Sequence, residues 1–133
     1  MEIRVSAAGG LPELVADRGR LLQVLSNLVI NVFQHAAGAA RVELSAEQQG
    51  GEILISVSDN GAGVSAEHLS HIFERLYRTN QARTRAAGGS GLGLAIVRDL
   101  VEAQGGTITA ENVPDGGFRI TLAFPIVRSA DPP

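Results

Sequence analysis

The chain has 133 residues, of which 44% are hydrophobic and 4% aromatic, and its formal net charge is −3. This length suits one globular domain with a core of aliphatic side chains. The charge does not favour binding to nucleic acid or to a membrane surface. The sequence contains neither cysteine nor lysine, which excludes disulfides, thiolate metal sites and nucleophiles of either type. No apolar run approaches the length of a membrane span, and the N-terminal residues do not resemble a signal peptide.

The N-terminal third of the chain predicts one long helix preceded by strands. Polar and apolar residues alternate over residues 2–6, which indicates a strand, and residues 13–16 suggest a second, shorter strand. Asp17 is a favourable N-cap for a helix that runs from Arg18 to about His35. Apolar residues recur at helical spacing through this segment, so we expect the helix to bury a broad face.

A strand that ends in a carboxylate is the first sign of a functional site. Strands are expected at residues 41–45 and 52–58, joined by a hairpin at 48–51, and Asp59 follows directly. A buried carboxylate needs hydrogen-bond donors, and the exocyclic amine of a purine is one. The glycines of the stretch Asp59-Asn60-Gly61-Ala62-Gly63-Val64 would let the backbone pass close to a flat ring. Taken alone, this stretch is also an ordinary turn.

The second half of the chain predicts two helices separated by an irregular segment. Ser65 caps a short helix at residues 66–73, and a second helix spans residues 92–103. Between them, residues 74–90 show little apolar periodicity and are rich in arginine, which is typical of a functional lid or of disorder. The remaining expected elements are strands at 107–110 and 118–124, a turn at 114–117 and a frayed tail from Ile126.

The long helix carries a polar stripe of Asn27, Asn31 and His35, spaced four residues apart. Residues at this spacing lie along one side of a helix, with a drift of about 40° per step. Such a stripe can simply face water. An amide oxygen is also a suitable ligand for Mg²⁺, and a neutral ligand does not repel a triphosphate. We therefore take Asn31 as the candidate metal ligand, with Asn27 able to position a water or a second oxygen.

A second glycine-rich stretch, Gly88-Gly89-Ser90-Gly91-Leu92-Gly93-Leu94, opens the last predicted helix. The free N–H groups and the dipole of a helix N-terminus attract anions such as phosphate. The stretch matches neither a P-loop nor a dinucleotide-binding fingerprint. A flexible hinge is the alternative interpretation.

Four segments, in their order and spacing, resemble the four boxes of sensor histidine kinase catalytic domains, within the GHKL superfamily. These segments are Asn27-Leu28-Val29-Ile30-Asn31, Asp59-x-Gly61-x-Gly63, Ile72-Phe73-Glu74-Arg75-Leu76-Tyr77-Arg78 and Gly89-x-Gly91-Leu92-Gly93-Leu94-Ala95-Ile96-Val97. The resemblance runs from about Asp17 to Pro125, which is nearly the whole chain. One box alone would be weak evidence, whereas four in order argue strongly against coincidence.

The resemblance implies a Bergerat-type α/β sandwich, in which three helices cover one face of a mixed sheet of about five strands. It implies one catalytic and ATP-binding domain at residues 1–125, a mobile ATP lid at 74–90 and a flexible tail at 126–133. It further implies that the chain binds ATP and Mg²⁺. The γ-phosphoryl group would pass to a histidine on a separate helical hairpin, in two-component signalling with a cognate response regulator.

The resemblance also assigns roles to individual residues. Asp59 would bind the adenine amine, Asn31 would hold Mg²⁺, and Arg78 would reach toward the γ-phosphate, so the expected catalytic residues are Asn27, Asn31 and Arg78. His35 would lie beside the ribose and the phosphates, although a partly buried helix histidine would explain it equally well. The other expected nucleotide contacts are Gly61, Gly63, Val64, Ile72, Tyr77, Gly89, Gly91, Leu92, Gly93, Leu94 and Thr121.

Some positions depart from the family pattern. Gln34 stands where many relatives carry Lys or Arg, and Leu76 replaces a second Phe in the lid motif. The phosphoacceptor histidine of these kinases lies in a His-Glu-Leu-Arg-like motif, which the surroundings of His35, His68 and His71 do not match. We therefore expect a monomeric catalytic fragment, which is the cytoplasmic part of a parent kinase with an acceptor hairpin, a sensor and membrane spans.

Two rival functions remain open. The first is a related ATP-hydrolysing clamp, as in topoisomerases and heat-shock chaperones, which place a water-activating Glu four residues before the metal Asn. Here that position is Asn27, which argues against efficient hydrolysis. The second is a non-catalytic nucleotide-binding module or an anti-sigma-factor-like serine kinase. The motif at residues 73–78 favours the histidine kinase branch.

Overall fold

The computed structural model describes residues 2–7, 9–10, 17–35, 38–74, 94–114 and 116–126, and gives only the backbone of Gln34 and His35. The strand expected at residues 13–16 and nearly all of the expected lid lie outside this described part. The described elements are β1 (Glu2–Ala7), α1 (Arg18–His35), β2 (Arg41–Gln49), β3 (Glu52–Asp59), α2 (Ala66–His71), α4 (Ala95–Glu102), β4 (Thr107–Asn112) and β5 (Phe118–Pro125).

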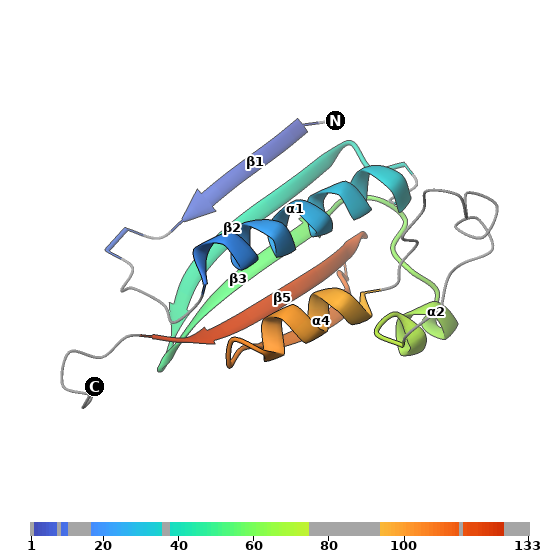
Figure 1. Ribbon diagram of the computed structural model, residues 1–133. Helices are drawn as coiled ribbons and strands as arrows, with labels where there is room; N and C mark the ends of the chain where they lie inside the picture. Colours follow the sequence, from blue (N-terminus) through green and yellow to red (C-terminus); the bar gives the residue numbers. More distant parts are fainter. Residues whose placement is uncertain are drawn as a thin grey trace, which may run out of the picture.

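The strands form a single five-stranded sheet in the order β1-β2-β3-β5-β4. β1 runs parallel to β2, and the other neighbouring pairs are antiparallel, so the sheet is mixed. Figure 1 shows α1 and α4 side by side across one face of this sheet, with α2 at the end of the same layer. The expected two-layer sandwich is confirmed. Among the described helices, none combines the length and the apolar character that a membrane crossing requires.

The core lies between the helices and the covered face of the sheet. In β3 and β5 buried and less buried residues alternate along the whole strand, because successive side chains point to opposite faces. The buried residues of these strands and helices are Val24, Leu28, Val32, Ile53, Ile55, Val57, Val97, Val101, Phe118, Ile120, Leu122 and Phe124. Each fully buried aliphatic side chain contributes roughly 1.5–3 kcal/mol. The other face of the sheet, which we call the open face, carries the alternate residues.

Pairing between strands explains why some elements end later than the sequence pattern predicts. β2 continues to Gln49, which pairs with Glu52, so the turn is confined to Gly50 and Gly51. Ile126 was expected in a frayed tail, and this prediction is wrong. Its N–H donates to the carbonyl of Gly51 at 3.1 Å, and its side chain packs partly buried against the core.

Helix ends differ less from expectation. Ser65 caps α2 as predicted, with its side chain accepting a hydrogen bond from the N–H of His68 at 3.2 Å. α2 ends at His71, two residues before the predicted end at Phe73. The N–H of Arg20 donates to Asp17 Oδ1 at 2.9 Å, which confirms the predicted cap of α1.

The β5 side chain of Leu122 is fully buried at the centre of the core, which makes it a direct test of this packing. Leu122→Ala should lower the free energy of unfolding by about 2–5 kcal/mol, because the cavity cannot collapse between a sheet and two helices. Thr107→Ala, on the exposed surface of the neighbouring strand, should change it by less than about 0.5 kcal/mol. Urea unfolding of both variants measures the difference, and equal effects would contradict this view of the core.

Candidate functional site

Asp59 ends β3 on the helix-covered face and is 91% buried, being 9% exposed. Its Oδ1 accepts a hydrogen bond from the N–H of Gly61 at 2.8 Å, and the backbone N–H of Phe118 is a second donor. Burial raises the pKa of this carboxyl above its ordinary value, and the two hydrogen bonds oppose that rise only in part. A carboxylate offers about four acceptor positions, so two donors leave room for a donor from a ligand.

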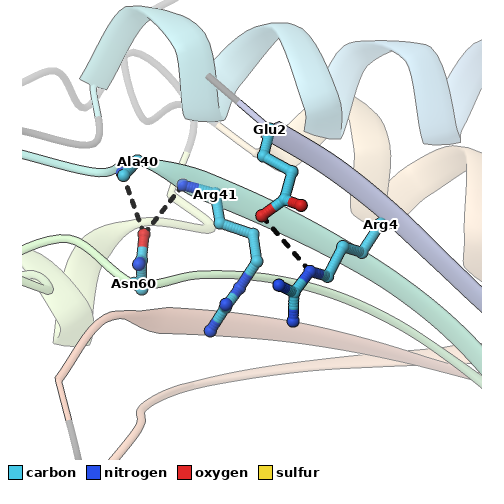
Figure 2. Close-up of polar contacts among 5 residues, drawn as sticks. All are labelled: Glu2, Arg4, Ala40, Arg41 and Asn60. Atoms are coloured by element: carbon cyan, nitrogen blue, oxygen red, sulfur yellow. Dashed lines mark hydrogen bonds and ion pairs between the residues drawn. The ribbon is translucent and has the colours of Figure 1, made fainter.

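The start of the loop after Asp59 is fixed by Asn60. Its Oδ1 accepts hydrogen bonds from the N–H groups of Ala40 and Arg41, each at 2.9 Å (Figure 2). The backbone N–H of Asn60 donates in turn to the carbonyl of Arg41 at 3.3 Å. The exit of β3 is therefore tied to the entry of β2, and Asp59 is held in one position by its own neighbour.

Glycines let the backbone close over Asp59. Gly117 has a φ of +104°, and a Cβ there would overlap the carbonyl oxygen of Asp59. Gly63 has a φ of +81°, and a Cβ there would lie 2.8 Å from Asn112 Oδ1. Both glycines are required by positive φ and by close contact. Gly63 was predicted as a site residue, whereas Gly117 was expected only in a turn and Phe118 only at the start of a strand.

Asn31 lies on the buried side of α1 and is 7% exposed. Its Oδ1 is a buried side-chain oxygen with no hydrogen-bond partner among the described residues. A buried acceptor without a partner is costly, so such an atom marks a position that a ligand can satisfy. A lone amide oxygen of this kind fits Mg²⁺, which prefers oxygen and keeps several waters. Asn27, one turn earlier, is exposed, and the His35 side chain lies outside the described residues.

Two more predicted residues meet at the far end of the helical layer. The N–H of Leu94 donates to the carbonyl of Ile72 at 2.8 Å, and both side chains are buried. The guanidinium of Arg98 lies 5.8 Å from the centre of the Phe73 ring, which adds a cation–π contact between α4 and the end of α2. The predicted residues Tyr77, Arg78, Gly89, Gly91, Leu92 and Gly93 lie outside the described part of the chain.

Thr121 is not brought to this site, which corrects its prediction as a nucleotide contact. It pairs with Ser56 across β5 and β3, and the two hydroxyl oxygens lie 3.4 Å apart. Both side chains belong to the open face, because they alternate with the buried residues Ile55, Val57 and Ile120. The carboxylate of Asp59 is on the covered face, so the sheet separates it from Thr121.

A hollow of about 270 Å³ is lined by Asp59 and Asn60 together with residues of the open face. Arg41, Ser58 and Arg119 border it from the open face, and Arg119 is paired with Glu111 at 3.1 Å. Figure 2 shows Arg41 extending over this face next to Arg4, whose Nε lies 3.2 Å from the carboxylate of Glu2. Of the predicted nucleotide residues in the described part of the chain, Asp59 alone lines this hollow.

The covered face carries a buried carboxylate with free acceptor capacity, glycines that allow close backbone packing around it and an amide oxygen without a partner among the described residues. The family described as histidine kinase-, DNA gyrase B-, and HSP90-like ATPase matches residues 16–128. The chain belongs to this family of ATPase domains.

Similar proteins indicate which branch of this ATPase family the chain resembles. The signal transduction histidine-protein kinase BaeS of Escherichia coli (strain K12) is 42% identical over 112 residues, which cover 84% of this chain and 24% of BaeS. Full-length ShkA in complex with AMPPNP aligns with a TM-score of 0.77 and 32% identity, over 96% of this chain and 26% of ShkA.

The catalytic domain of the histidine kinase ThkA aligns with a TM-score of 0.74 and 27% identity, over 96% of this chain and 81% of that domain. ThkA in complex with the response regulator protein TrrA aligns with a TM-score of 0.72 and 25% identity, over 94% of this chain and 34% of that one. The chain spans about a quarter to a third of the length of the first curated relatives that it matches.

Asp59 should make the stability of the nucleotide-free chain depend on pH. Its pKa is raised above 3.8 in the folded state, so the protonated form favours the fold. That contribution is fully present below the unfolded-state pKa and is lost as pH rises through the raised value. Asp59→Asn, which is always neutral, should therefore gain stability relative to wild type between pH about 3.5 and about 7. Urea unfolding at both pH values measures this, and a constant difference would contradict the raised pKa.

Proposed function

We propose that this chain is the catalytic, ATP-binding domain of a sensor histidine kinase. It binds ATP with Mg²⁺ and transfers the γ-phosphoryl group to a histidine on a separate helical hairpin of the parent kinase. The observation that carries this proposal is the presence, on the covered face, of both a buried, partly free Asp59 carboxylate and an Asn31 oxygen with no partner among the described residues. The similarity to histidine kinases over most of the chain supports it.

The geometry of Asp59 supports its proposed role as the group that binds the adenine base. Its carboxylate accepts a hydrogen bond from the adenine amine, while Gly61 and Phe118 keep it oriented through their N–H groups. Gly61 and Gly63 bring backbone rather than side chain against the ring, and the partly buried Val64 supplies apolar surface. Because a guanine would present a carbonyl oxygen where adenine presents an amine, the acceptor at Asp59 selects adenine.

The phosphate end uses residues of α1 and of the segment before α4. Asn31 would hold Mg²⁺, which when bound neutralises charge on the transferring phosphoryl group. Arg78 would contact the γ-phosphate through its permanent charge, and the backbone N–H groups of Gly89, Gly91 and Gly93 would bind the phosphates. The nucleophile is an imidazole of the partner hairpin, so this domain binds and orients ATP and forms no covalent intermediate.

The partners follow from the same proposal. The acceptor hairpin docks on the phosphate end, and a cognate response regulator then takes the phosphoryl group from the hairpin. The complex of ThkA with TrrA supports a response regulator as the partner class. We place the chain in the cytoplasmic part of a membrane-anchored parent, as a monomeric domain at residues 1–125 with its lid at 74–90.

The clamp ATPase alternative has less support. Hydrolysis needs a general base that activates water, and the position four residues before Asn31 holds the exposed amide of Asn27. An amide cannot accept a proton from water at neutral pH, so turnover without an acceptor histidine should be slow. A domain that only binds the nucleotide would leave the acceptor histidine unmodified. The transfer experiment below distinguishes this role from that of a kinase.

Two substitutions should separate the ends of the site. Asp59→Asn turns an acceptor into a donor that faces the adenine amine, so ADP affinity should fall by about tenfold or more with or without Mg²⁺. Asn31→Ala leaves the base end intact, so metal-free binding should survive while Mg²⁺ no longer strengthens it. Calorimetry with Mg²⁺ and with chelator gives four comparisons. Equal losses for Asn31→Ala in both conditions would make Asn31 a structural residue.

Transfer itself should require a supplied acceptor. With γ-labelled ATP, acid-labile label should appear on an added histidine hairpin from a related kinase and not on this chain. Asn31→Ala should abolish the label, because Asn31 is proposed to hold the metal. Stoichiometric phosphohistidine on this chain alone would contradict the proposal, and so would rapid phosphate release without any labelled hairpin.

A further inference from the structure

Asn112 makes two hydrogen bonds to the backbone of Val64. Val64 ends the loop at residues 60–64, which we call the glycine loop. The Oδ1 of Asn112 accepts from the Val64 N–H at 2.8 Å, and its Nδ2 donates to the Val64 carbonyl at 2.7 Å. The carboxamide thus pairs with Val64 as a neighbouring strand would. Asn112 is the last residue of β4 and follows Ile108 and Ala110 on the helix-covered face, where their side chains pack against the core.

The contact is built into the packing around it. A Cβ on Gly63 would lie 2.8 Å from Asn112 Oδ1 and 3.2 Å from the carbonyl oxygen of Gly117. That Gly117 carbonyl accepts a hydrogen bond from Val113 at 2.9 Å, which closes the turn between β4 and β5. The glycine loop, Asn112 and the turn therefore fit together only because Gly63 has no side chain.

The loop is consequently held at both ends by carboxamide groups. Asn60 ties its start to Ala40 and Arg41, and Asn112 ties its end to β4. Between them Gly61, Ala62 and Gly63 offer little side chain for packing, and glycine has the largest backbone freedom to lose. The position of the middle of this loop depends on its two anchors.

We propose that Asn112 is a positioning residue for the nucleotide base. Its two hydrogen bonds would fix the distance between the backbone of Gly63 and Val64 and the Asp59 carboxylate, so that a planar purine fits between them. The base end of the site would therefore be preorganised before binding. This inference rests on the proposed function. Asn112 acts through Val64 and touches neither the phosphates nor the metal, so it should set nucleotide affinity and leave the transfer step alone.

Two variants and a control test this role. Asn112→Ala removes both hydrogen bonds, and Asn112→Asp keeps the size but sets a carboxylate oxygen against the Val64 carbonyl. Both should weaken ADP binding by about tenfold, the scale of two neutral hydrogen bonds. Glu111→Ala, one residue earlier, breaks only the open-face pair with Arg119 and should leave ADP affinity unchanged.

Two further readouts separate positioning from general stability. Hydrogen exchange of the Val64 amide should accelerate in both Asn112 variants while amides in the middle of β3 stay protected. With a supplied hairpin, the KM for ATP should rise about tenfold while kcat at saturating ATP stays within about twofold of wild type. If Asn112→Ala fails to fold, Asn112→Asp carries the same comparison.

The outcomes are distinguishable. Wild-type ADP affinity in a variant whose Val64 amide exchanges freely would overturn the inference and leave the proposed function standing. A fall in kcat at unchanged KM would also overturn it, because Asn112 would then act on the transfer step. If the wild-type chain binds no ADP, the proposed function fails and this inference fails with it.

Discussion

The close approach of the start of β5 to the end of β3 is the constraint on which the site depends. Gly117 passes so near the Asp59 carbonyl that no side chain fits there. This approach brings the Phe118 N–H to the Asp59 carboxylate and buries the carboxylate at the same time. Without that donor, Gly61 would be the one remaining described donor that opposes the desolvation of Asp59, so the turn between β4 and β5 helps to stabilise the acceptor.

The covered face accepts two polar groups that weaken the nucleotide-free fold. Asp59 has a pKa raised by burial, and Asn31 Oδ1 has no partner among the described residues. Asp59 pairs with the fully buried Val42 of β2, and Asn31 lies about one turn after the fully buried Leu28 on α1. Apolar residues at these two positions would be more stabilising. A local loss of folding stability of this kind, in a core otherwise built from aliphatic residues, is characteristic of a binding site.

Much of this arrangement could be predicted from the sequence, because it follows from local periodicity. Alternation identified β3 and β5, helical spacing identified α1, and the position of Asp59 directly after a buried strand indicated an acceptor. Asn112 could not be found in this way, because its importance depends on the pairing of β4 with a loop 48 residues away. Thr121 was misplaced because residue type alone does not say which face of a strand a side chain occupies.

The two proposed ends of the site differ in the groups that the described residues place there. The base end is built from strand termini and is held by backbone and carboxamide hydrogen bonds from Asn60, Phe118 and Asn112. The metal end, in the described residues, is a single amide oxygen of α1 that lacks a partner. Under the proposed function, the base is recognised by a preorganised surface, and the Asn31 oxygen gains its missing partner when the metal binds. Under this proposal the domain would hold the adenine nucleotide by its base and would present the phosphates for transfer to a second domain.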